Sequence, residues 1–405
     1  MALIVQKYGG TSVGDIERIR NVAKRIVKTY DQGHEVVVVL SAMSGVTDGL
    51  IAMAHQASKM PDKRELDVLM STGEQTTIAL MAMTLDDMGY PAASLLGFQA
   101  DIITDSMSTK ARIMSIGAER IKKMLAEKKI VVIAGFQGID PDGNITTLGR
   151  GGSDTSAVAI AAAVKADSCE IYTDVDGVYT TDPRICDKAR KLKQISYDEM
   201  LEMASLGAKV LQIRSVGFAK KYNVPIHVRS SFNEEEGTMV VGEDSGMEKL
   251  VVSGITLDKN EARLTLKKVP DQPGIASKVF VPLAEAGIQV DMIIQNTRAA
   301  GQTDLTFTVN KTDAKQATLI AEKVAKEIGA EEVLMADDIA KVSVIGVGMK
   351  NHAGVAATMF STLAAENINI RLISTSEIRI SCVIDDRYAE LAVRVLHQAF
   401  NLDKI

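Results

Sequence analysis

Two glycine-rich segments contain the residues best suited to binding phosphate. The segment 7–12 (KYGGTS) follows a short apolar run and places the ammonium of Lys7 beside two glycines. The segment 149–154 (GRGGSD) sets Arg150 and Asp154 at the start of an alanine-rich stretch with helical character. Turns of this kind present backbone N–H groups, and the start of a helix adds a positive dipole end. Both segments are therefore candidate sites for a phosphorylated ligand.

Both segments can also be explained as purely structural turns that bind no ligand. Glycines between a strand and a helix often serve the turn alone, and Ser153 or Asp154 would cap the helix that follows. The sequence contains no Walker motif (GxxxxGK followed by Ser or Thr), so neither segment is a P-loop. In the second segment, two charges beside three glycines favour a binding site over a simple cap.

Two more polar segments lie where a ligand could bind. The segment 71–75 (STGEQ) interrupts an apolar helical pattern, although a capping box between its first and fourth residues explains it as well. The segment 173–184 (TDVDGVYTTDPR) follows an apolar strand and carries side chains that could hold a nucleotide or its Mg²⁺. It lacks the glycine and the glutamate of a calcium loop, so that alternative is rejected. Ser41 and Thr47 follow another apolar strand and are either turn residues or ligands.

No arrangement of histidine or cysteine in the sequence supports nucleophilic catalysis. The five histidines are scattered, and each is more typical of a surface or core position than of a ligand. Cys169, Cys186 and Cys382 lie far apart along the chain and form neither a metal-ligand cluster nor a disulfide framework. Cysteines of this kind fit a reducing compartment, so we expect a cytoplasmic protein.

Length and composition are those of a folded protein of two or three domains. The 405 residues are 46% hydrophobic and 24% charged, and the apolar runs have the length of strands. A membrane span would need roughly 18 consecutive apolar residues. The net charge is −6, without a dense basic cluster, so we expect neither a nucleic-acid nor a membrane partner. The N-terminus enters a strand-like run at once and is interpreted as mature sequence.

Residues 1–232 alternate short apolar runs with helical patterns, which is typical of an α/β domain. Strands are predicted over 2–5, 35–40, 130–133, 169–173 and 225–228. Between them, segments such as 15–30 place their apolar residues on one helical face. We therefore expect a mostly parallel sheet sandwiched by helices.

The acidic, glycine-bearing stretch 233–249 is predicted to be a linker between domains. Beyond it the sequence repeats itself, because 271–280 and its continuation align without gaps with 351–360 at an offset of 80 residues. Each copy has the pattern of a strand, a glycine turn, a helix and a β-rich segment, as in a βαββαβ unit. A stacked array needs three or more repeats, so we expect a pair of small ferredoxin-like α+β domains.

Taken in order, these segments resemble the aspartate kinases of the amino-acid kinase superfamily. The likeness rests on KYGGTS at 7–12, STGE at 71–74, GRGGSD at 149–154, TDVDGVY at 173–179 and GAK at 207–209. It covers essentially the whole chain, and the repeat resembles the paired ACT domains of these enzymes. The family's usual Phe is replaced by Tyr8. No homoserine dehydrogenase segment follows, which implies the monofunctional form.

The resemblance implies roles for individual residues. It assigns ATP binding to Lys7, Gly9, Gly10, Ser41, Thr173, Asp174, Tyr179, Arg184 and Lys209. It assigns aspartate binding to Thr11, Ser12, Thr47, Glu74, Arg150, Gly151, Gly152 and Ser153. Lys7 and Asp154 are the implied catalytic pair, with Asp154 orienting Lys7 or the first loop. Mg²⁺ often keeps phosphate oxygens and water as its main ligands, so no protein side chain is assigned to it.

The implied reaction is transfer of the γ-phosphoryl group of MgATP to the side-chain carboxylate of L-aspartate, the first step toward lysine, threonine and methionine. A carboxylate with a pKa of about 4 is already ionised at neutral pH, so no general base is needed. One alternative is another kinase of the superfamily, acting on glutamate, acetylglutamate, carbamate or UMP. A second is a non-catalytic amino-acid sensor, which would have lost Lys7 or Arg150; both are present.

The repeat is the implied regulatory part of the chain. By resemblance, a strand predicted over 251–257 belongs to the second copy, so one ACT domain (262–336) is inserted into the other (250–261 and 337–405). The two domains are expected to lie side by side with joined sheets. Lysine, threonine or both would bind at the glycine turns and nearby strand ends. The candidate regulatory residues are Asp271, Gly274, Ile275, Gln295, Asn296, Gly354, Val355, Ser376 and Glu377.

Met247 follows the linker and immediately precedes the complete regulatory half. An internal start there would produce a small subunit, as in relatives that pair large and small subunits. The alternative is an ordinary linker methionine. We therefore expect either a homo-oligomer or a tetramer of large and small subunits.

Overall fold

The protein is described by a computed structural model covering residues 1–404 except 208–209, 244–249 and 299–300. The chain forms two compact units. The first comprises Met1–Tyr179 and Lys191–Glu248, and the second comprises Thr180–Arg190 and Lys249–Ile405. Lys209 and Met247, for which the sequence predicts ATP binding and an internal start, lie outside the described residues.

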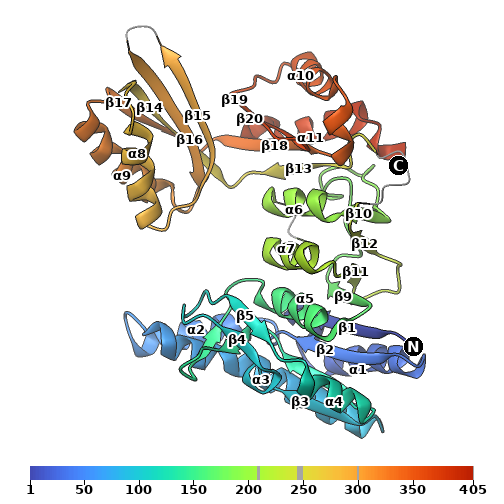
Figure 1. Cartoon of the computed structure of the whole chain (residues 1–405). Helices are drawn as coiled ribbons and strands as arrows, with labels where there is room; N and C mark the ends of the chain where they lie inside the picture. Colours follow the sequence, from blue (N-terminus) through green and yellow to red (C-terminus); the bar gives the residue numbers. More distant parts are fainter. Residues whose placement is uncertain (208–209, 244–249, 299–300, 405) are drawn as a thin grey trace. The chain divides into compact units, whose positions relative to one another are not determined.

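An eight-stranded sheet organises the first unit (Figure 1). Its strands are β1 (Leu3–Tyr8), β2 (Glu35–Leu40), β3 (Ala92–Leu95), β6 (Ile130–Ala134), β9 (Ser168–Thr173), β10 (Gln194–Ser196), β11 (Ile226–Ser230) and β12 (Thr238–Val241). They follow the order β10-β12-β11-β9-β1-β2-β6-β3, and every neighbouring pair is parallel except β11 with β12. The expected mostly parallel sheet is confirmed, and β3, β10 and β12 extend it beyond the predicted strands.

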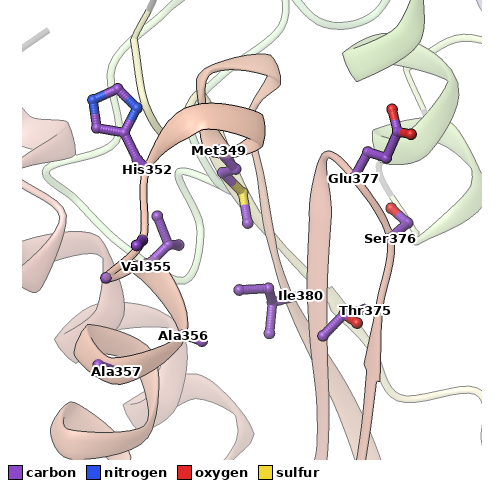
Figure 2. Close-up of a pocket in the computed structure, with 11 residues that line it drawn as sticks. Met349, His352, Val355, Ala356, Ala357, Thr375, Ser376, Glu377 and Ile380 are labelled. Atoms are coloured by element: carbon purple, nitrogen blue, oxygen red, sulfur yellow. The ribbon is translucent and has the colours of Figure 1, made fainter.

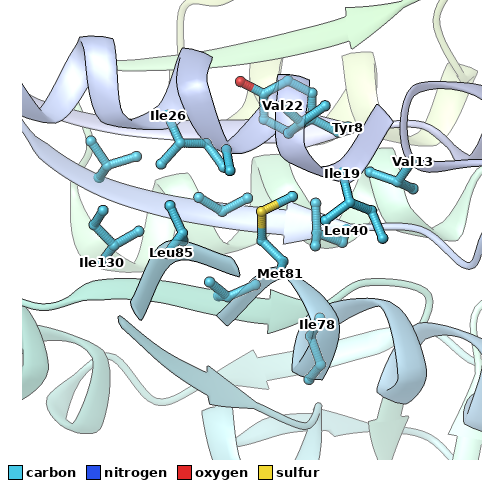
Figure 3. Close-up of a cluster of buried hydrophobic side chains, with 14 of the residues drawn as sticks. Tyr8, Val13, Ile19, Val22, Ile26, Leu40, Ile78, Met81, Leu85 and Ile130 are labelled. Atoms are coloured by element: carbon cyan, nitrogen blue, oxygen red, sulfur yellow. The ribbon is translucent and has the colours of Figure 1, made fainter. Parts of the chain in front are cut away.

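Helices cover both faces of this sheet. They are α1 (Ile16–Asp31), α2 (Val46–Ala57), α3 (Lys63–Asp87), α4 (Glu119–Ala126), α5 (Gly152–Val164), α6 (Tyr197–Ser205) and α7 (Ile213–Tyr222). α1 begins where the side chain of Asp15 accepts a hydrogen bond from the N–H of Arg18, at 2.8 Å. α1 and α3 bury their apolar faces against the sheet in one cluster (Figure 3), to which Ile19, Ile26 and Met81 contribute.

Alternation along β1 sends neighbouring side chains to opposite faces of the sheet. Tyr8 packs in the apolar cluster beneath α1 and α3. Lys7, one residue earlier, points to the other face, where α5 contacts β1. The helix α5 is rich in alanine and almost completely buried, so small side chains let it lie close to the strand.

A second, smaller sheet in the first unit lies outside the prediction. It contains β4 (Ile102–Thr104), β5 (Ile113–Ile116), β7 (Gln137–Ile139) and β8 (Ile145–Thr147), in the order β5-β4-β7-β8. Its strands span three or four residues each, which is too short to show a period of two in the sequence. β8 ends two residues before the second glycine-rich segment begins.

The second unit contains two four-stranded sheets. One has β14 (Glu261–Pro270), β15 (Val290–Arg298), β16 (Gln302–Asn310) and β17 (Glu332–Ala336), with helices α8 (Ile275–Glu285) and α9 (Ala314–Ile328). The other has β13 (Gly254–Asp258), β18 (Ile339–Ile345), β19 (Leu372–Thr375) and β20 (Arg379–Asp385), with α10 (Val355–Ala365) and α11 (Ala389–Ala399). The two glycine turns of the repeat precede α8 and α10. β13 pairs with β18, so this strand joins the second copy although it precedes the first in sequence.

The expectation that the two sheets of the repeat join within the chain is wrong, because they form separate sheets. An ion-pair cluster and a small apolar cluster hold the two copies together instead. Lys341 on β18 is 2% exposed and pairs with Asp291 on β15 and, at 2.7 Å, with Glu261 on β14. Met292 packs beside Ile339 and Val383.

Among the helices of the described residues, none has both the length and the apolar character required to cross a membrane.

Candidate active site and regulatory pocket

The carboxyl ends of neighbouring parallel strands bring several predicted segments to one edge of the large sheet. β9, β1 and β2 lie side by side and run in the same direction. The loops after them hold the segments 173–179, 9–12 and 41–47. A Cβ on Gly10 would lie 2.8 Å from the carbonyl oxygen of Ala42, so two of these loops approach closely because Gly10 has no side chain. Ligands of open α/β sheets bind at such an edge.

Lys7 and Asp154 form a buried ion pair at this edge. The Lys7 Nζ lies 2.5 Å from Asp154 Oδ1, and each side chain is 10% exposed. Lys7 comes from β1, and Asp154 from the first turn of α5. A Cβ on Gly9 would lie 3.5 Å from the Lys7 Nζ, so the ammonium lies directly beneath the first glycine turn.

The prediction that Ser153 or Asp154 caps α5 is wrong. The N-cap residue is Gly151, with a left-handed φ of 70° and no side-chain cap, so Ser153 and Asp154 lie within the first turn. Gly135, after β6, allows close packing here, since a Cβ on it would lie 2.8 Å from the Cβ of Ser153. The first N–H of the helix, that of Gly152, donates to the carbonyl oxygen of Gly149 at 2.9 Å, and no side chain caps this turn, which carries the positive end of the helix dipole.

Glu74 lies in the middle of α3, so a capping box at Ser71 is also wrong. Its Oε1 accepts a hydrogen bond from the N–H of Ala42 at 2.9 Å, while its Oε2 is buried without a hydrogen-bond partner. Burial raises the pKa of Glu74 to about 7, and the hydrogen bond from Ala42 opposes that shift. Gly73 makes the contact possible, because a Cβ there would lie 2.8 Å from the Ala42 side chain. An unpartnered buried carboxylate oxygen is suited to receive a cationic group.

The segment after β9 forms a polar surface stabilised by Asp176. The hydroxyl of Tyr179 donates to Asp176 at 3.0 Å, and the Lys191 Nζ lies 3.2 Å from the same carboxylate. The Thr173 hydroxyl donates to Asp174, whose side chain is exposed. The loop therefore offers polar groups to a ligand at the end of β9.

Other predicted substrate residues lie on the same loops. Ser12 is buried, with its Oγ 2.6 Å from that of Ser231, and the carbonyl oxygen of Thr11 accepts a hydrogen bond from Arg18. Thr47 lies in the first turn of α2, and Arg150 is exposed directly before Gly151.

Arg184 does not belong to the first compact unit, which holds these residues. It belongs to the segment Thr180–Arg190 of the second compact unit, and its guanidinium pairs with Asp182 at 2.7 Å. The ATP-binding role expected of it therefore stays a prediction, as does that of Lys209.

Two charged residues near the second glycine-rich segment could not be identified from the sequence pattern. Asp67 on α3 accepts hydrogen bonds from Thr109 and Thr147, and Arg214 on α7 donates to Leu148 and Ala111. The one sequence signal for Asp67 is its place seven residues before Glu74, which puts both on one face of the helix. Nothing local marks Arg214, because its partners are backbone carbonyls more than 60 residues away.

Four of the predicted regulatory residues line one cavity in the second copy of the repeat (Figure 2). The cavity has a volume of about 420 Å³ and lies between the loop that enters α10 and the β19–β20 turn. The four residues are Gly354, Val355, Ser376 and Glu377, and Met349, His352, Thr375 and Ile380 also contribute to the lining. The site thus combines an apolar floor with a carboxylate and a hydroxyl at the turn.

The corresponding residues of the first copy lie at the surface. Asp271 and Gly274 are exposed, and Ile275 is the first residue of α8. Gln295 and Asn296 are exposed on β15, opposite Leu305 and Asp304 of β16. The two glycine turns differ in conformation, since Gly274 has a φ of 89° whereas Gly354 is extended at 173°.

Within the part of the chain that the structure describes, no group of three or more His, Cys, Asp or Glu side chains could hold a metal ion by itself.

Comparison with known protein families shows to which class of protein the chain belongs. Residues 2–230 match the Amino acid kinase family, and residues 263–329 and 342–400 match the ACT domain. The chain is 57% identical to an aspartate kinase of Stutzerimonas stutzeri, over 100% of this chain and 98% of the relative.

Two solved structures of E. coli aspartokinase III are similar in fold. One, in complex with aspartate and ADP (R-state), has a TM-score of 0.80 and 27% identity, and covers 98% of this chain and 99% of that chain. The other, in complex with lysine and aspartate (T-state), has a TM-score of 0.79 at the same identity and coverage. The chain therefore belongs to the aspartate kinases of the amino acid kinase family, as the sequence motifs predict. It is an ATP-dependent enzyme that phosphorylates aspartate, and it carries ACT regulatory domains.

Proposed function

We propose that the enzyme transfers the γ-phosphoryl group of ATP to the side-chain carboxylate of L-aspartate, giving 4-phospho-L-aspartate and ADP. The observation that supports this most directly is the pair of Lys7 and Asp154 at the start of α5. It holds an ammonium beside a glycine turn and an uncapped helix N-terminus. Phosphoryl transfer depends on positioning and charge stabilisation of this kind.

Lys7 binds the phosphates whose charge changes during transfer, and Asp154 orients the ammonium of Lys7. The backbone N–H groups of Gly10 and Gly151 complete the anion site, whereas those of Gly9 and Gly152 donate to the carbonyl oxygens of Tyr172 and Gly149 and shape the two turns. The acceptor carboxylate is ionised at neutral pH, so no protein group has to remove a proton from it.

Aspartate is bound through its two other charged groups. Its ammonium pairs with the unpartnered Oε2 of Glu74, and Arg150 holds a substrate carboxylate through two parallel hydrogen bonds. The hydroxyls of Thr47 and Ser153, with those of Thr11 and Ser12, supply further polar contacts.

The nucleotide is held at the end of β9. Thr173, Asp174 and Tyr179 line the site together with Ser41, and Arg184 and Lys209 are the remaining predicted ligands. Mg²⁺ fits this arrangement because phosphate oxygens and water satisfy most of its ligands. When bound, it neutralises charge on the phosphates.

Feedback control is proposed to act through lysine, threonine or both, bound at the glycine turns of the ACT domains. The pocket of the second copy has the size and the polar groups for an amino acid, and the E. coli relative was solved with lysine. The residues proposed are Asp271, Gly274, Ile275, Gln295, Asn296, Gly354, Val355, Ser376 and Glu377.

The reaction is proposed to open the route to lysine, threonine and methionine in the cytoplasm. A homo-oligomer, or a tetramer with a small subunit started at Met247, is the proposed assembly. Replacing Met247 with Leu and finding the same short chain by mass spectrometry would exclude translation from that codon.

A panel of acceptors tests the proposed substrate. Formation of ADP is measured with aspartate, glutamate, acetylglutamate, carbamate and UMP at matched concentrations. Aspartate should support the fastest turnover. A higher kcat/KM with any other acceptor would overturn the assignment.

A further inference from the structure

Two charged side chains brace the peptide that leads to Arg150, and the proposed mechanism does not use either of them. Asp67 lies on α3 and is completely buried. Arg214 lies in the first turn of α7 and is partly buried. They reach the same two segments, 109–111 and 147–149, from different helices.

The carboxylate of Asp67 ties Thr109 to Thr147. Both of its oxygens accept hydrogen bonds from the N–H of Thr109, at 3.1 and 2.9 Å, and Oδ1 accepts a third from the Thr147 hydroxyl at 2.5 Å. Thr109 has a φ of 67°, a left-handed conformation that a β-branched residue seldom adopts. Such strain persists only where the surroundings enforce it. Asp67 supplies that constraint.

The guanidinium of Arg214 makes the complementary contacts to carbonyl groups. Nη1 donates to the oxygen of Leu148 at 2.6 Å, and Nη2 donates to the oxygen of Ala111 at 3.0 Å. The N–H of Ala111 in turn donates to the carbonyl oxygen of Thr147 at 2.9 Å. One side chain thus satisfies donors and the other satisfies acceptors of the same pair of segments.

The glycines that follow depend on this arrangement. A Cβ on Gly149 would lie 3.1 Å from the carbonyl oxygen of Thr109, and one on Gly151 would overlap the Gln212 side chain at 1.9 Å. Gln212 is the N-cap of α7, two residues before Arg214 in the chain. The peptide around Arg150 therefore runs through a narrow passage whose walls are set by the braced segment and by the start of α7.

We propose that Asp67 and Arg214 are positioning residues for the phosphoryl acceptor: by fixing the peptide 147–149, they fix where Arg150 presents its guanidinium to aspartate. This inference rests on the proposed function, which assigns Arg150 to a carboxylate of aspartate. Neither residue needs to touch a substrate. Their effect is larger on the binding of aspartate than on the binding of ATP, because ATP also contacts Lys7 and the loop after β9, which belong to other elements.

The test compares the full-length variants Asp67→Asn and Arg214→Lys with a matched control, Asp140→Asn. Asp140 is also a buried carboxylate that accepts backbone N–H bonds, from Asp142 and Asn144, and a hydrogen bond from the Ser106 side chain, so its partners differ from the segments 109–111 and 147–149 that Asp67 and Arg214 contact. Each of the two brace variants, Asp67→Asn and Arg214→Lys, should raise the KM for aspartate by about 10- to 100-fold. An increase of this size is expected when a binding group is misplaced by up to about an ångström. The KM for ATP should stay within about threefold of the wild-type value.

Further readouts separate positioning from general loss of stability. The melting temperatures of the brace variants and of Asp140→Asn are compared, and the double brace variant should be less than additive because both changes free the same peptide. Hydrogen exchange should increase in peptides that cover 107–112 and 145–152 in the brace variants only. The inference is overturned if the KM for aspartate rises no more than in Asp140→Asn, if both KM values rise alike, or if exchange in these peptides is unchanged. If the wild-type enzyme prefers another acceptor, the proposed substrate is wrong; the brace is then judged by exchange and by the KM for that acceptor.

Discussion

The ammonium of Lys7 and the carboxylate of Asp154 lie 2.5 Å apart, with 10% of each side chain exposed. The pair links the carboxyl edge of the sheet to the first turn of α5. Removing two charges from water is unfavourable unless each has its partner, so breaking such a pair leaves one charge uncompensated. The position of the ammonium is thus fixed before a substrate binds, which reduces the rearrangement that catalysis requires.

Replacing Lys7 with alanine should lower kcat by at least about 100-fold, because one contact to transferring charge contributes on the order of 3 kcal/mol. Steady-state assays with saturating ATP and aspartate measure this effect. Lys24→Ala, at an exposed position on α1, is the matched control and should retain normal turnover.

The same substitution leaves Asp154 buried and unpaired, so folding has to be monitored. Circular dichroism should show an intact fold, and the double variant Lys7→Ala with Asp154→Asn should recover thermal stability without recovering turnover. Near-normal turnover in Lys7→Ala would remove this residue from the mechanism.

Binding of aspartate should depend on pH through Glu74. Its pKa is raised to about 7, and only the ionised form pairs with the substrate ammonium. As pH increases through about 7, Glu74 loses its proton, so kcat/KM for aspartate should rise and then level off above that value. The measurement is a pH profile of kcat/KM for aspartate and, separately, for ATP.

Glu74→Gln should remove this ascending limb and weaken saturation by aspartate more than saturation by ATP. The glutamine keeps the size of the side chain and can still accept a hydrogen bond from Ala42. A limb that persists in Glu74→Gln would belong to another group, and an effect confined to ATP would reverse the assignment.

Five strands of the large sheet (β1, β2, β6, β9 and β11) and both helices of the repeat that follow a glycine turn could be predicted because their apolar patterns are long and regular. β2, for example, is a run of apolar residues buried on both faces. The small sheet of β4, β5, β7 and β8 could not, since its strands are too short to display a period.

For the active site, the sequence pattern identified residues whose motifs are local, such as Lys7 and Glu74. The contacts of these side chains could not be predicted. The partner of Glu74 is the backbone of Ala42, and Asp67 and Arg214 act on backbone groups of distant loops. Backbone partners leave no signature in residue types, so such contacts emerge only from the folded chain.

The stability of the second unit should fall in mild acid because of His397. This side chain is buried on α11, with Nε2 2.9 Å from the Thr180 hydroxyl, and burial lowers its pKa below the ordinary 6.5. The unfolded chain therefore takes up a proton first as the pH falls, so the free energy of unfolding decreases between 6.5 and the lower folded-state value. His397→Gln should lose this dependence. Urea unfolding at pH values on both sides of 6.5 provides the comparison, and an identical pH dependence in the variant would exclude His397 as its source.

Feedback inhibition should depend on the regulatory residues in both copies of the repeat. Glu377→Ala and Ser376→Ala should weaken inhibition by lysine or threonine in the pocket of the second copy, and Asp271→Ala and Gln295→Ala should do so in the first. A coupling of roughly 1 to 3 kcal/mol corresponds to about a 5- to 150-fold change in affinity.

Inhibition curves and thermal-shift titrations with both amino acids measure these effects, with activity in their absence expected to be unchanged. Ser361→Ala, at an exposed position on α10 that does not line the pocket, is the control. Unaltered inhibition by both amino acids in all four variants would place the sensing site elsewhere.

Chemical identification of the product tests the proposed reaction most directly. The wild-type enzyme is incubated with ATP, Mg²⁺ and L-aspartate, and hydroxylamine is added to convert an acyl phosphate into a hydroxamate that mass spectrometry can locate. We expect the hydroxamate on the side-chain carboxylate, in a one-to-one ratio with ADP, and its loss in Lys7→Ala. Formation of ADP without an aspartate hydroxamate, or a hydroxamate on the α-carboxylate, would contradict the proposed reaction.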